Sequence, residues 1–121
     1  MDDAVESMKL RANALNFKLV GHQPLYKELE AMGLPSRRVE IFQFCDARIA
    51  HAMLAQSLEF AAYLPCRITL IEDQGGQPWL VSLDLNRVIA MANLPPELLG
   101  HATQVRDSIR EIMEAGASGD L

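Results

Sequence analysis

The fold class of this chain follows from residues 39–84, which read VEIFQFCDARIAHAMLAQSLEFAAYLPCRITLIEDQGGQPWLVSLD. Residues 39–44 predict a β-strand with Val39 and Ile41 facing one way and Phe42 and Phe44 the other, so we expect a central strand that is covered on both faces. Asp46 is expected to cap a helix that runs to about residue 57. Gly75-Gly76 tolerates positive φ and predicts a tight hairpin between two further strands.

The flanking segments add helices and one more strand. Apolar residues at helical spacing predict helices over residues 2–15, 24–33 and 95–113, and residues 86–92 are weakly helical. Residues 17–20 alternate like a half-buried strand.

Together these elements predict one α+β domain over residues 1–115, followed by a flexible tail over residues 116–121. We expect a single compact domain with a mostly antiparallel four-stranded sheet packed with three to four helices. Gly21-His22-Gln23 is expected to form a turn between a strand and a helix.

Composition excludes several classes of protein. The 121 residues are 50% hydrophobic and carry a net charge of −5, from 16 acidic and 11 basic residues. The basic residues are scattered along the chain, which argues against nucleic-acid binding. No apolar run reaches the ~20 residues of a membrane span, and the acidic N-terminus is unlike a signal peptide. We therefore expect a cytoplasmic protein, in which a reducing environment keeps the two cysteines as thiols.

Two cysteine motifs in order, Phe44-Cys45-Asp46-Ala47 and Leu64-Pro65-Cys66-Arg67, resemble the domain-of-unknown-function 302 family of small bacterial and archaeal proteins. The resemblance extends from Asp2 to about Ala115 and implies an α+β fold and a homodimer. The chain departs from the family in two respects. It lacks the usual strand before the first helix, and Ala47 stands where proline is usual. The resemblance assigns no catalytic residue, because the activity of the family is not established.

The cysteines are the candidate functional thiols. Cys45 precedes a helix N-terminus, where the helix dipole favours a thiolate, although the charge of Asp46 opposes it. Cys66 precedes Arg67, which would also favour a thiolate. If the two strand ends are adjacent, the sulfurs would be close enough for a reversible disulfide, a persulfide relay or half of a metal site.

The histidines His22 and His51 are possible neighbours of these thiols. His51 lies six positions after Cys45, which is a poor spacing for shared ligation on one helix face. The sequence has no C-x₂-C or H-x₃-H spacing, so it leaves the question of a metal or cofactor open.

Three functions remain open. The first is a thiol-based binding or carrier module, linked to sulfur or redox chemistry, in which Cys45 reacts and Cys66 resolves. The second is a module that binds a metal, haem or small ligand. The third is a structural or regulatory interaction protein with inert cysteines. A dimer face of the favoured first module would use Phe60, Tyr63 and Trp79. An enzyme has the least support, because no nucleophile elbow, nucleotide motif or acid–base pair is visible.

Overall fold

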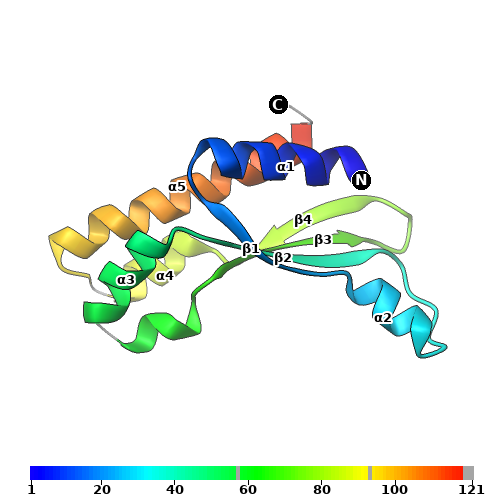
Figure 1. Ribbon diagram of the computed structural model, residues 1–121, viewed down its shortest axis with the longest axis horizontal. Coiled ribbons are helices and arrows are strands. Elements are labelled where there is room, and N and C mark those ends of the chain that lie inside the picture. Colours follow the sequence, from blue (N-terminus) through cyan, green and yellow to red (C-terminus); the bar gives the residue numbers. More distant parts are fainter. Residues whose placement is uncertain (57, 93, 119–121) are drawn as a thin grey trace.

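The computed structural model describes residues 1–56, 58–92 and 94–118. Its elements follow in the order shown in Figure 1: α1 (Asp2–Ala14), β1 (Lys18–Gln23), α2 (Leu25–Ala31), β2 (Val39–Cys45), α3 (Ala47–Gln56), the 3₁₀ helix η1 (Leu58–Ala62), β3 (Cys66–Glu72), β4 (Pro78–Ser82), α4 (Leu85–Ala92) and α5 (Pro96–Ser118).

The four strands form one antiparallel sheet in the order β1-β2-β3-β4. The α+β class and the four-stranded antiparallel sheet predicted from the sequence are therefore confirmed. The β3–β4 hairpin is confirmed as well. Its turn is held by Asp73, whose Oδ1 accepts hydrogen bonds of 2.9 Å from the backbone N–H groups of Gly75 and Gln77.

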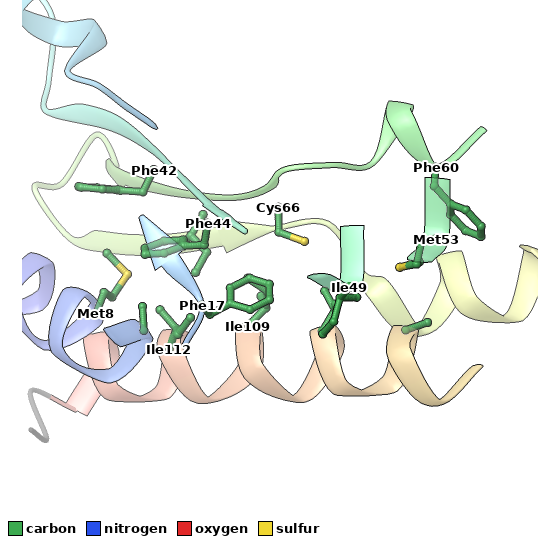
Figure 2. Packing of buried hydrophobic residues seen from close by; sticks show 14 of the residues in the cluster. Met8, Phe17, Phe42, Phe44, Ile49, Met53, Phe60, Cys66, Ile109 and Ile112 are labelled. Atoms are coloured by element: carbon green, nitrogen blue, oxygen red, sulfur yellow. The ribbon is translucent and has the colours of Figure 1, made fainter. Parts of the chain in front are cut away.

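Helices α1 and α5 lie side by side over one face of the sheet, as Figure 1 shows. The side chains that fill this layer alternate along the strands, because successive side chains of a strand point to opposite faces. Figure 2 shows Phe42 and Phe44 of β2 above Ile109 and Ile112 of α5. All four are buried, and burial of an apolar side chain of this size contributes roughly 1.5–3 kcal/mol.

The opposite face of the sheet is open, so the prediction that β2 is covered on both faces is wrong. Val39 and Ile41 are only half-buried, while the alternate residues of β2 are fully buried. The physical reason is that both helices of the covering layer cross the same face. Figure 1 places α2 at one end of the sheet and α3, η1 and α4 at the other.

Two local predictions are also corrected. The turn expected at Gly21-His22-Gln23 is wrong, because β1 continues through these residues with a bulge between Leu19 and Gly21. The described residues hold five α-helices rather than three to four, since the weakly helical residues 86–92 lie in α4, which begins at Leu85.

The terminal helix continues through residues 116–118, which the sequence assigned to a flexible tail. Gly116 is buried there, because a Cβ atom at this position would lie 2.8 Å from both Met8 Cγ and Leu80 Cδ1. Residues 119–121 of the expected tail, and the expected helix end at residue 57, lie outside the described residues.

Candidate functional site

The two cysteines lie at adjacent strand ends but on opposite faces of the sheet. Cys66 pairs with Phe44 across the β2–β3 ladder and shares its covered face, where Cys66 is only 5% exposed. Figure 2 shows Cys66 among the buried apolar side chains. Cys45 follows Phe44 directly, so its side chain points to the open face, and it is half-buried. Both are free thiols, and the pleat of the strand turns them away from each other.

The surroundings of both thiols favour the protonated form. Burial raises the pKa of Cys66 to about 11, with a smaller contribution from Cys45. Burial also raises the pKa of Cys45, and the charge of Asp46 adds to this effect. Since the thiolate is the nucleophile, these environments lack the activation that a reactive cysteine needs.

Asp46 caps α3, as the sequence predicted. Its Oδ1 accepts a hydrogen bond of 3.0 Å from the backbone N–H of Arg48 in the first turn of the helix. The same carboxylate is the acidic neighbour that disfavours a thiolate at Cys45.

The two histidines expected near the thiols, His22 and His51, have other surroundings. His22 is in β1, stacks on Phe42 with ring centroids 4.6 Å apart, and places Nε2 3.0 Å from Oε1 of Glu40. His51 is exposed on α3. Among the residues that the structure describes, no group of three or more His, Cys, Asp or Glu side chains is placed to hold a metal ion.

A buried carboxylate, which sequence reasoning missed, organises the other end of β2. Glu40 is only 5% exposed, and its Oε2 accepts a hydrogen bond of 2.6 Å from Nε of Arg38. Nη2 of Arg38 also donates to Oδ1 of Asp2 at 2.7 Å, which ties β2 to the start of α1. We call Asp2, His22, Arg38 and Glu40 the Glu40 cluster.

The Glu40 carboxylate is ionised in this cluster. Burial by itself would raise its pKa, but the hydrogen bonds from Arg38 and His22 outweigh burial, and the pKa of Glu40 falls below its ordinary value. An ionised Glu40 can only accept hydrogen bonds, so Nε2 of His22 carries the proton that it donates to Oε1. The signal in the sequence was the alternation of β2, which puts position 40 on the same face as Phe42 and Phe44.

The open face of the sheet carries apolar side chains in two cross-strand rows. One row runs from Val39 through Ile71 to Trp79, and the other runs from Ile41 through Thr69 to Val81; Trp79 is 56% exposed and Val81 52% exposed. We call these six residues the open face. Of the aromatic residues expected to form a dimer face, Trp79 and Tyr63 are exposed, whereas Phe60 is buried and cannot contribute.

The fold and these surfaces define a class: small α+β proteins with an antiparallel sheet that two helices cover on one face only. The chain belongs to the family described as "Domain of unknown function DUF302", whose profile matches residues 1–116. The family resemblance seen in the two cysteine motifs is thus confirmed.

A solved structure shares this fold. The crystal structure of an uncharacterized conserved DUF302 protein from Bacillus stearothermophilus superimposes with a TM-score of 0.79 at 18% sequence identity, covering 94% of this chain and 88% of that one. No curated protein matches the sequence. Within the described ranges, no helix has the length and apolar character needed to cross a bilayer.

Proposed function

We propose that this chain is a non-catalytic interaction module that works as a homodimer through its open face. The observation that supports the proposal is the row of neighbouring apolar side chains at Val39, Ile71 and Trp79, of which Ile71 and Trp79 are exposed. An apolar surface of this kind on a small protein marks an interaction site, because water contact with it is unfavourable.

The size of the uncovered side of the sheet fits a second copy. Its four strands ~4.8 Å apart, with about six residues each at ~3.3 Å per residue, give a footprint of roughly 400 Å² on each copy, and the open face is the part of it on β2, β3 and β4. The accessible area of such a corrugated surface exceeds its flat footprint, so two copies approach the ~1,000 Å² of total buried area that a specific interface needs.

The charge of the open face also fits a second copy. All six residues are uncharged, and in a two-fold interface each patch meets its own counterpart. Charged residues in the middle of such a patch would face like charges, whereas neutral apolar rows are self-complementary. A face-to-face pairing of two sheets is an ordinary packing arrangement for proteins.

Self-association is tested with Ile71→Glu, which places a carboxylate in the middle of one row. We expect wild-type protein to have twice the 13.4 kDa mass of one chain in light-scattering chromatography, and the variant to have the mass of one chain. Trp79 is the only tryptophan, so its emission should shift to the red when wild-type protein is diluted and should already be red-shifted in the variant.

The matched control is Leu10→Glu, an exposed apolar residue of α1 on the other side of the molecule. It should leave both the mass and the Trp79 emission unchanged. A wild-type mass of one chain at all concentrations, or an Ile71→Glu dimer, would overturn the proposal.

The thiol-based carrier role expected from the sequence stays a prediction, and the raised pKa of each thiol argues against it. We expect native labelling by a thiol reagent to be slow at pH 7 for both cysteines, with Cys66 reacting more slowly because it is buried. The rate at Cys66 should rise with pH without an inflection below pH 9, and denaturant should accelerate labelling at both sites.

Separate readout of Cys45 and Cys66 by mass spectrometry gives the answer for each thiol. Fast labelling of native Cys45, with an inflection of the rate at a pH well below ~8.5, would instead support a functional thiolate there.

We also propose a reducing, cytoplasmic location for this protein, with which two free thiols are consistent.

A further inference from the structure

A groove continues the open face toward η1. It has a volume of about 460 Å³ and lies against β3, β4 and the segment that joins η1 to β3. This volume is within the ~300–1,000 Å³ of typical small-ligand sites. The residues that matter for its chemistry are Tyr63, Arg67, Val81, Leu83 and Leu85, all of which line it.

The groove combines an apolar wall with one cation. Val81 and Leu83 are more than half exposed, so they present an apolar surface to whatever occupies the groove. Arg67 is the only charged residue in the described lining. Within the described parts of the chain, its guanidinium forms no ion pair, although its backbone carbonyl accepts a hydrogen bond of 2.6 Å from Oγ of Ser82.

The unpaired guanidinium is the distinctive feature of the groove. Arg38, by comparison, is fully engaged by Glu40 and Asp2, and Arg11 pairs with Glu111. A planar guanidinium with five N–H donors matches the two oxygens of a carboxylate in a bidentate pair. The chain as a whole is negative, with a net charge of −5, so a local cation is what allows an anion to bind here.

We propose that this groove binds a small amphipathic carboxylate. The carboxylate pairs with Arg67, and the aliphatic body lies along Val81, Leu83 and Leu85, with the exposed phenol of Tyr63 at the rim. This site goes beyond the proposed dimer, because it assigns a ligand to the groove. The two surfaces overlap at Thr69 and Val81, which line the groove and also belong to the open face.

Calorimetric titration with octanoate, octan-1-ol and acetate, each at low ionic strength, tests both parts of the site. We expect octanoate to bind with a dissociation constant on the order of 0.1–1 mM, which is ordinary efficiency for a ligand of this size. Octan-1-ol, which lacks the charge, and acetate, which lacks the apolar body, should each bind about 10-fold more weakly. Added salt should weaken the binding of octanoate and acetate and leave that of octan-1-ol unchanged.

Arg67→Gln removes the cation from an exposed strand position, and Arg87→Gln is the matched control, since Arg87 is exposed on α4 and does not line the groove. Arg67→Gln should lower the affinity for octanoate to the level of octan-1-ol, whereas Arg87→Gln should leave the affinity for octanoate unchanged. Any of three results would overturn the proposal. Octanoate could fail to bind wild-type protein, it could bind no more tightly than octan-1-ol, or it could bind Arg67→Gln with unchanged affinity.

The monomeric variant separates this test from self-association, which involves Thr69 and Val81 as well. Ile71 does not line the groove, so octanoate should bind Ile71→Glu at least as tightly as it binds wild-type protein. Octanoate binding by the monomeric variant would therefore support the groove proposal whether or not the wild-type protein forms a dimer. Loss of octanoate binding in Ile71→Glu would overturn the proposal that one chain forms the complete ligand site.

Discussion

Arg38→Ala is expected to lower the free energy of unfolding by about 2–4 kcal/mol at pH 7, as measured by urea denaturation. The reason is the carboxylate that it leaves behind. Glu40 is buried, and Arg38 supplies its shortest hydrogen bond, at 2.6 Å. Removing one partner of a buried ion pair costs more than the pair itself contributes, because the remaining charge stays desolvated. The contact of Arg38 with Asp2 adds little, because that carboxylate is exposed.

The pH dependence of this loss identifies its source. In wild-type protein the pKa of Glu40 is lowered from its ordinary value of 4.5, so its stabilisation is present above pH 4.5 and is lost as pH falls through the folded-state pKa. Without Arg38, burial is left largely unopposed and raises that pKa. The variant can then protonate Glu40, so its deficit should shrink as the pH is lowered from 7 toward about 4.

Glu40→Gln is the control for the charge. It keeps the size of the side chain and an oxygen that can accept from Arg38, so we expect a smaller loss of about 1–2 kcal/mol. Its stability should vary less than that of wild-type protein between pH 7 and about pH 4. A deficit in Arg38→Ala that stays constant over this range would show that a buried carboxylate is not its cause.

Phe44→Ala is expected to be the most damaging single truncation, with a loss of about 3–5 kcal/mol in the free energy of unfolding. Phe44 is fully buried on the covered face, between its neighbours in β1 and β3 and the helix α5. Alanine would leave a cavity that the two-helix layer can close only in part. Thermal and urea unfolding followed by circular dichroism should agree on the size of the loss.

Val20→Ala is the comparison for the covering layer. Val20 is an apolar residue of the same sheet, but it is 56% exposed, so its truncation should cost no more than about 0.5 kcal/mol. Equal losses in the two variants would contradict the assignment of the core to the face that α1 and α5 cover.

Much of the local structure was predictable from the sequence. The alternation of β2, the Gly75-Gly76 turn and the cap at Asp46 depend on interactions between residues a few positions apart, and all three are present. The turn expected at Gly21 failed because a cross-strand partner overrides local turn propensity. Gly21 pairs with Gln43, and the strand accommodates a bulge there.

The candidate site was predicted in part. The sequence left open whether the ends of β2 and β3 are adjacent, and the pairing of Phe44 with Cys66 shows that they are. The orientation of the thiols was not anticipated, because a one-residue difference in register turns a side chain to the other face. Arg67 was identified as a neighbour of Cys66, but its groove requires Tyr63 and Val81, which come from other segments of the chain.

The sequence by itself determined the α+β class, the family and the set of residues that share each side of a strand, because these depend on short-range periodicity and motif order. Only the tertiary structure decided which side of the sheet is covered. That choice depends on α1 and α5, which pack together from opposite ends of the chain. Their position buries Glu40, which pairs with Arg38 and His22, and it leaves Ile71 and Trp79 exposed.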